Sequence, residues 1–220
     1  MHVPAARLPL AVRLWHGFTA LLFSILAITG IKLHFAPPLL LHFGYALATQ
    51  LHHACGIALA IIYVLYCVFV CVTGYWRQYI PVFRGLPKRL RAQLRAYTND
   101  LGRRSKHTNP NDDNPEQRFN TLQQLVYGIV FFCLLPLLIV SGLAYLYYPE
   151  ISPDSVLGFA GLWPLALVHY VLGIGGIMYL VTHIYMAVSD ARTGARFKRM
   201  TTGRVTPNPS DKHARERPRR

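Results

Sequence analysis

The sequence predicts an all-α protein, an integral membrane bundle of four helices. Apolar residues make up 53% of the 220 residues and charged residues only 15%, whereas charged residues form about 25% of an ordinary soluble chain. The apolar residues are gathered into four runs, and each run is long enough to supply the about 20 residues that cross a bilayer. Nearly all of the 23 Lys and Arg residues lie outside these runs.

The four predicted spans are residues 14–32, 51–76, 122–148 and 162–188. The first run contains polar residues and has no cleavage pattern, which indicates a retained span rather than a signal peptide. Pro136 lies inside the third run, where a membrane helix tolerates proline because neighbouring groups satisfy the freed backbone atoms. Tyr79 follows the second run and is expected at the headgroup level. We interpret residues 1–205 as one domain and residues 206–220 as a basic, disordered tail.

The basic residues predict the orientation of the spans. Ten Lys and Arg residues lie in the loop 77–118, and ten more lie between positions 192 and 220. The segment 33–50 has no charged residue, and the segment 148–164 has two acidic residues and no Lys or Arg. Because short loops rich in Lys and Arg stay on the cytoplasmic side, both termini and the loop 77–118 are expected to be cytoplasmic.

The net charge of +14 would also suit a nucleic-acid-binding protein. Basic residues that flank membrane spans on one side are a topology signal first, so nucleic acid is not an expected partner. Within the basic loop, Leu86, Leu90 and Leu94 recur every four residues among Lys and Arg, as in an amphipathic helix on a membrane surface. Membrane lipids are therefore the expected contact of this helix, and docking of a protein partner is the alternative.

Five histidines lie inside the predicted spans, near their ends. Ionisable side chains are rare in membrane spans and usually face the bundle interior, where they have a function. Because successive spans run in opposite directions, His16 and His183 are expected at the cytoplasmic end. His169 and either His52 or His53 are expected at the opposite end. The histidines thus form two pairs at two membrane depths.

The spacing within the fourth span points to a cofactor. His169 and His183 are fourteen positions apart, which corresponds to about 21 Å along a helix and to side chains roughly 40° apart around it. Two opposed neutral imidazoles and an apolar pocket are what a non-covalent b-type haem requires. Gly56 follows His52 by four residues, as Gly173 follows His169. One turn from a ligand, a missing side chain leaves room for the macrocycle, so this pattern favours His52 over His53.

Other readings of these residues predict different chemistry. A single histidine in a membrane span is often an interhelical hydrogen-bond donor, but four histidines matched in depth favour ligation. Zinc or copper is not expected, because the two pairs are too far apart for one ion and no carboxylate or thiolate joins them. The motif Cys-x-x-Cys-His does not occur, which excludes covalent c-type haem. The four cysteines lie in apolar runs and are interpreted as small buried residues.

At these residues the chain resembles a known family, the di-haem cytochrome b subunits of formate dehydrogenases, nickel–iron hydrogenases and thiosulfate reductases. These belong to the wider bacterial cytochrome b561 superfamily, and the resemblance covers residues 13–205. The matching segments are Arg13–His16 with Thr29-Gly30, Leu51–Gly56, Phe119–Gln123, Val168-His169, Thr182–Ala187 and Arg199–Val205. The resemblance implies that His16, His52, His169 and His183 ligate the iron of two b haems, and that the chain lies in the bacterial inner membrane.

The resemblance also implies a quinone site beside the cytoplasmic haem. The Asn-x-x-Gln motif of the family matches Asn120 and Gln123, whose amides could donate hydrogen bonds to quinone carbonyls. Asn120 could equally cap the third span. Many relatives have Lys or Arg where this chain has Gln124. Arg13 lies one turn before His16, where its guanidinium would suit a haem propionate or act as an ordinary interfacial anchor.

Three functions remain open at this point. The expected one is an electron-transfer subunit that links the quinone pool (menaquinone or ubiquinone) to iron–sulfur and catalytic subunits at the periplasmic face. The alternative is a stand-alone cytochrome b561-type oxidoreductase that acts with quinone and a small redox partner. A transporter or passive anchor without haem is the third, and it predicts a colourless protein. Fold analogy does not choose the terminal substrate.

Overall fold

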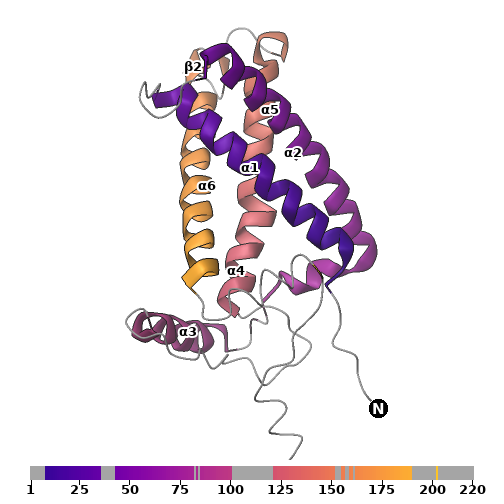
Figure 1. Cartoon of the computed structure of the whole chain (residues 1–220), viewed down its shortest axis with the longest axis vertical. Helices are drawn as coiled ribbons and strands as arrows, with labels where there is room; N and C mark the ends of the chain where they lie inside the picture. Colours follow the sequence, from indigo (N-terminus) through magenta and orange to yellow (C-terminus); the bar gives the residue numbers. More distant parts are fainter. Residues whose placement is uncertain are drawn as a thin grey trace, which may run out of the picture.

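The predicted all-α membrane fold is confirmed by the computed structural model of the chain, which contains four long apolar helices (Figure 1). The structure describes residues 8–35, 43–81, 83, 85–100, 121–151, 155–156, 159–160, 162–189 and 202. The tail 206–220 and most of the second half of the basic loop lie outside the described residues.

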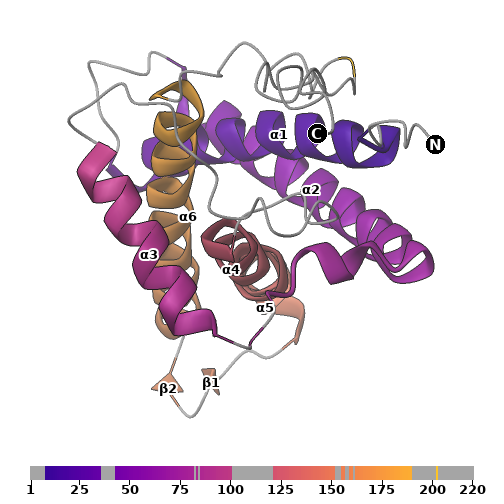
Figure 2. The ribbon, with the colours of Figure 1, turned by 90° about the horizontal axis from the view of Figure 1, so that it is seen from below.

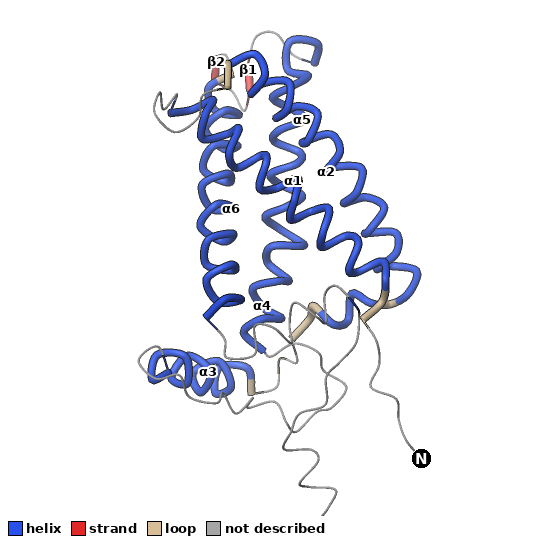
Figure 3. The backbone as a smooth tube through the Cα atoms, in the orientation of Figure 1, coloured by secondary structure: helices blue, strands red, loops and turns tan. Residues whose placement is uncertain are grey.

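The elements follow one another along the chain as helices with one short hairpin (Figure 3). They are α1 (Leu10–Phe35), α2 (Tyr45–Thr73), the 3₁₀ helix η1 (Tyr75–Gln78), α3 (Leu86–Asp100), α4 (Thr121–Ile129), the π-helical segment η2 (Val130–Leu134), α5 (Leu135–Ile151), β1 (Ser155–Val156), β2 (Phe159–Ala160) and α6 (Trp163–Ser189). The two strands pair antiparallel. We call the end of the bundle beside β1 and β2 the hairpin end and the opposite end the α3 end.

The helices that can cross a membrane are Leu10–Phe35, Tyr45–Thr73, Leu122–Tyr147 and Trp163–Val188. The second helix begins six residues before its predicted span. Polar Thr49 interrupts the apolar run there, but its hydroxyl donates to the Tyr45 carbonyl at 3.1 Å and so remains satisfied inside the helix. The same helix ends at Thr73, because Gly74 adopts a left-handed conformation (φ 67°) and caps it.

Large apolar side chains cover the outside of the bundle. Val72 is 81% exposed, and Leu65 and Met178 are each 65% exposed. A soluble monomer rarely exposes such contiguous apolar surface, whereas lipid chains would cover it. The exposed apolar belt and the helix lengths together describe a multi-pass membrane protein.

The four spans pack as two pairs, α1 along α2 and the α4–α5 helix along α6. Figure 1 shows α1 crossing the bundle diagonally between α6 and α2. Contacts between α1 and α6 are few. Near the hairpin end, the His34 ring of α1 stacks on the Tyr170 ring of α6, with ring centres 4.0 Å apart. Farther along, a Cβ at Gly176 would lie 2.7 Å from the Phe23 ring, so glycine is required for this close approach.

An aromatic core lies between α1, α2 and η2. Trp15 stacks on Tyr66 at 4.1 Å between ring centres, and Phe131 packs edge-on against both. Tyr79 folds back against this core, stacks on Phe131 and hydrogen-bonds the Tyr66 hydroxyl at 2.8 Å. Only 5% of Tyr79 is exposed, so its side chain packs against the bundle instead of facing outward, and its expected depth at the headgroup level stays a prediction. Burial raises the pKa of Tyr79 to about 12, so the hydroxyl keeps its proton at neutral pH.

The π-helical segment η2 results from Pro136. The Leu135 amide donates to the Val130 carbonyl, five residues back, instead of to Phe131. The next possible donor to the Phe131 carbonyl would be residue 136, and proline has no N–H. The Tyr63 hydroxyl of α2 donates to this carbonyl at 3.0 Å and replaces the missing bond.

Removing this hydroxyl by Tyr63→Phe is expected to destabilise the protein by about 1–3 kcal/mol, because a buried carbonyl then lacks a donor. Thermal unfolding of the purified protein in detergent measures the effect. Tyr145→Phe is the matched control, since Tyr145 is 47% exposed on α5. Equal unfolding temperatures for the two variants would contradict this role of Tyr63.

Helix α3 lies across the α3 end of the bundle. Seen from that end, α4 is viewed nearly along its axis while α3 runs lengthwise beside it (Figure 2). Lys88, Arg91 and Arg95 are exposed on α3, and so is Leu94. This placement suits the predicted amphipathic helix on a membrane surface.

Candidate functional site

Two histidines face each other near the hairpin end. His52 comes from the second turn of α2 and His169 from the second turn of α6, and their ring centres are 6.3 Å apart. The planes of the two rings are inclined by 83°. The neighbouring His53 is exposed, whereas His52 is partly buried. The structure thus brings His52, not His53, opposite His169, and we call these two residues the hairpin-end pair.

Each member of the hairpin-end pair contacts a hydroxyl and a glycine that are adjacent in sequence. Thr29 Oγ1 lies 2.8 Å from His52 Nδ1, and a Cβ at Gly30 would lie 3.4 Å from His52 Cε1. Ser141 Oγ lies 3.0 Å from His169 Nδ1. A Cβ at Gly142 would lie only 2.9 Å from His169 Cε1. The helices α1 and α5 therefore hold the two imidazoles from opposite sides of the bundle.

A second pair, the α3-end pair, consists of His16 on α1 and His183 on α6. Their ring centres are 6.1 Å apart and the ring planes are inclined by 52°. Tyr179 stacks on His183 with ring centres 5.5 Å apart, and Tyr127 of α4 approaches the same imidazole edge-on at 6.0 Å. The rings of Tyr127 and Tyr179 thus contact His183 of this pair, whereas hydroxyls contact both members of the hairpin-end pair.

The separation within each pair suits one metal ion between two imidazoles. Rings that coordinate a metal from opposite sides, with bonds of about 2 Å, hold their centres roughly 6 Å apart. No group of three or more His, Cys, Asp or Glu side chains occurs among the described residues. Each pair can therefore supply two nitrogens, and a metal held there would need its other ligands from a bound group, as a porphyrin provides.

Space beside the hairpin-end pair also suits a macrocycle. A Cβ at Gly173 would meet nothing within 4 Å, and one at Gly56 would meet only a Leu26 methyl at 4.0 Å. Both glycines lie one turn beyond a histidine of the hairpin-end pair. The residues present thus fit a haem, which needs two axial nitrogens and an apolar pocket.

The other predicted site residues lie at the α3 end or outside the described residues. Arg13 is partly buried, one turn before His16 on α1. Asn120 is outside the described residues, so its two expected roles remain predictions. Gln123 is partly buried in the first turn of α4, and Gln124 is 2% exposed. Tyr127, which contacts His183, follows Gln123 by one turn.

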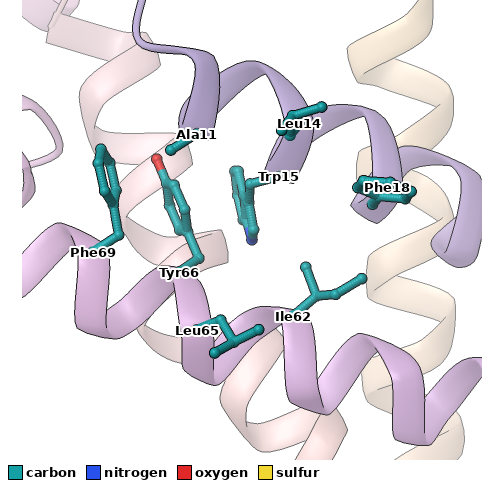
Figure 4. Close-up of a pocket in the computed structure, with 8 residues that line it drawn as sticks. All are labelled: Ala11, Leu14, Trp15, Phe18, Ile62, Leu65, Tyr66 and Phe69. Atoms are coloured by element: carbon teal, nitrogen blue, oxygen red, sulfur yellow. The ribbon is translucent and has the colours of Figure 1, made fainter.

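A hollow of about 320 Å³ lies between α1 and α2, and no histidine of either pair lines it. Figure 4 shows Trp15, Tyr66 and Phe69 along it, with Leu14, Phe18 and Leu65. Its lining is almost wholly apolar, and it lacks the convergent polar groups of a specific ligand site. The surface suits a lipid chain better than a redox cofactor.

Sequence reasoning missed the hydroxyls and tyrosines around the histidines. Thr29-Gly30 was noted only as a segment of the family resemblance, and Ser141, Tyr127 and Tyr179 had no predicted role. The signal that could have found the hydroxyls is a repeated dipeptide. A hydroxyl residue followed by glycine occurs near the hairpin end of both α1 and α5, at the depth of a histidine on the neighbouring helix.

The fold and the paired histidines define a class, a multi-pass membrane protein with imidazole pairs at two depths. Within this class the chain belongs to the family of prokaryotic cytochrome b561, which it matches over residues 7–203. It is 30% identical over 193 residues to "Putative cytochrome YdhU" of Escherichia coli (strain K12), across 88% of this chain and 71% of that protein. No solved structure shows a significant match.

Family membership confirms the predicted resemblance and its coarser consequences. The chain is a transmembrane cytochrome b, its family implies b-type haem, and the class is consistent with electron transport. The number of haems, the quinone and the partner enzyme belong to the proposal that follows.

Proposed function

We propose that the chain carries electrons through two b haems between a quinone pool and a partner redox enzyme. The observation that supports this function is the pair of facing imidazoles at each end of α6, with ring centres 6.3 Å and 6.1 Å apart. His169 and His183 are fourteen positions apart, or about 21 Å along the helix. Two redox centres at this spacing would span most of a hydrocarbon core of about 30 Å.

In this proposal His52 and His169 hold one haem iron, and His16 and His183 hold the other. Haem b, when bound, supplies a reversible one-electron Fe(III)/Fe(II) couple. The surrounding apolar side chains would exclude water, and the two imidazoles of each pair would hold the iron. Arg13, one turn from His16, would place a guanidinium beside a propionate.

The quinone site is proposed at the α3 end, on Gln123 and Asn120. Gln123 lies one turn before Tyr127 on α4, and the Tyr127 ring contacts the imidazole of His183. An amide there could donate a hydrogen bond to a quinone carbonyl while remaining close to the haem on the α3-end pair. We propose that this end is cytoplasmic, as the basic loop and tail predict, so protons for quinone reduction would come from that side.

The hairpin end would then face the periplasm of a bacterial inner membrane. The haem on His52 and His169 would exchange electrons there with an iron–sulfur subunit, itself joined to a catalytic subunit of the formate dehydrogenase, hydrogenase or thiosulfate reductase type. The described part of the chain contains no cluster of cysteines that could hold an iron–sulfur centre. The substrate chemistry is therefore assigned to the partner.

The haem content of the purified chain tests the proposal. A pyridine haemochrome spectrum is expected to give two b haems per chain, and reduced quinone is expected to reduce them. A colourless protein would refute the haem assignment, and one haem per chain would refute the two-centre path. Co-purification of an iron–sulfur protein would favour a subunit, whereas a lone active cytochrome would favour the stand-alone cytochrome b561-type oxidoreductase.

A further inference from the structure

The hairpin-end pair is held by two hydroxyls that are almost fully buried. Thr29 is 1% exposed and Ser141 is 5% exposed. Buried hydroxyls need hydrogen-bond partners, and Thr29 and Ser141 have partners of the same two kinds. Each contacts the Nδ1 atom of one imidazole and a backbone carbonyl of its own helix.

The direction of these hydrogen bonds follows from the number of protons. Thr29 Oγ1 donates its single proton to the Ile25 carbonyl at 2.8 Å. With that proton donated to the carbonyl, Thr29 can only accept from His52, which assigns the proton of that imidazole to Nδ1. Ser141 Oγ lies 3.1 Å from the Leu138 carbonyl and 3.0 Å from His169 Nδ1, and the same assignment makes it donate to the carbonyl and accept from Nδ1. Both imidazoles then have an unprotonated Nε2, the form in which a neutral histidine ligates a metal.

We infer that Thr29 and Ser141 are positioning residues that hold His52 and His169 as Nδ1–H tautomers, leaving both Nε2 lone pairs for haem iron. The inference rests on the proposed haem ligation. Partners of this kind fix the ring orientation of a metal-bound histidine and raise its basicity. A more basic axial ligand stabilises Fe(III), so the two hydroxyls lower the reduction potential of this haem.

The two histidine pairs differ in this respect. Among the described residues, His16 and His183 have no hydrogen-bond partner; their rings face each other, and two tyrosine rings contact His183. The same hydroxyl device thus occurs twice at the hairpin end, on α1 and on α5, and in the described part of the chain it is missing from the α3 end. Loss of a hydroxyl is therefore expected to change the reduction potential of the haem at the hairpin end and to leave that of the other haem unchanged.

The test compares Thr29→Val with Thr49→Val in the full-length, haem-loaded protein. Thr49 also donates to a carbonyl four residues back, but it contacts no imidazole. Redox titration followed by haem absorbance is expected to show an upward shift of one midpoint potential in Thr29→Val, with the other unchanged. In Thr29→Val, haem is expected to transfer from the hairpin-end site to apomyoglobin at least about 10-fold faster than in the wild type. Thr49→Val should match the wild type in both measurements.

Two further variants keep the test decisive. Thr29→Ser restores the hydroxyl and should restore both the potential and the haem retention. Ser141→Ala removes the hydroxyl on the other side of the pair and should reproduce the Thr29→Val effect even if Thr29→Val fails to fold. Wild-type potentials in Ser141→Ala, or in a folded Thr29→Val, would overturn the inference. A wild-type chain without haem would instead refute the proposed function.

Discussion

Replacement of His52 by leucine is expected to remove about half of the haem, whereas replacement of His53 should leave the haem content unchanged. The two residues are adjacent, but His52 faces His169 at 6.3 Å while His53 is exposed on the outside of α2. A haem that lost one of its two histidine ligands would be held from one side only, so we expect it to dissociate during purification. The pyridine haemochrome spectrum per chain measures the result.

Double variants test which histidines share a haem. His52→Leu combined with His169→Leu should lose no more haem than either single variant, because both changes empty the same site. His52→Leu combined with His183→Leu should lose all of it, because the changes affect different sites. Full loss from the first combination, or half loss from the second, would show that the pairing by membrane depth is wrong.

Much of this arrangement was predictable, because it depends on one-dimensional patterns. Apolar run lengths give the spans, and the alternating direction of the spans gives the depth of each histidine. The fourteen-residue spacing of His169 and His183 then places both on one face of α6. The choice of His52 over His53 needs the rotation of α2 about its axis. Gly56 favoured the rotation that places His52 toward the bundle interior. In the structure His52 contacts Thr29 of α1.

The features that could not be predicted depend on competition between local bonds or on packing between distant segments. Pro136 was expected to be tolerated, but the π-helical segment also requires Tyr63, 68 positions from Phe131 along the chain. Tyr79 reaches the core because Gly74 turns the chain back with a positive φ. The roles of Thr29 and Ser141 are invisible in composition, since hydroxyls that donate to their own helix are common in membrane spans.

The surroundings of the two pairs also suggest that the two ends of α6 have different roles. The hairpin-end pair has a hydroxyl against each imidazole, which would suit a haem of constant geometry in the proposed exchange with a protein partner. The α3-end pair has the rings of Tyr127 and Tyr179 against His183. That end also holds the half-buried Gln123 of the proposed quinone site. We therefore expect substitutions at the two ends to affect different partners.

Gly142→Ala is expected to weaken the hairpin-end haem site strongly, although alanine is a better helix former than glycine. The added Cβ would lie 2.9 Å from His169 Cε1, closer than such contacts allow. If the His169 imidazole moves away from this Cβ, its hydrogen bond to Ser141 lengthens and the ring no longer faces His52 in the same way. Overpacking of this kind costs about 1–3 kcal/mol, and here the cost falls on haem retention.

Gly175→Ala is the matched control on α6. A Cβ at that position would meet nothing within 4 Å, and the residue is exposed. The control should keep both haems and gain up to about 1 kcal/mol of stability, because alanine replaces glycine inside a helix. Haem per chain and the unfolding temperature in detergent separate the two effects. If Gly142→Ala retained both haems as firmly as Gly175→Ala, His169 would not be held against α5 in the functional protein. Two facing imidazoles on one iron would not tolerate a displaced ring. The proposed ligation at the hairpin end would then be wrong.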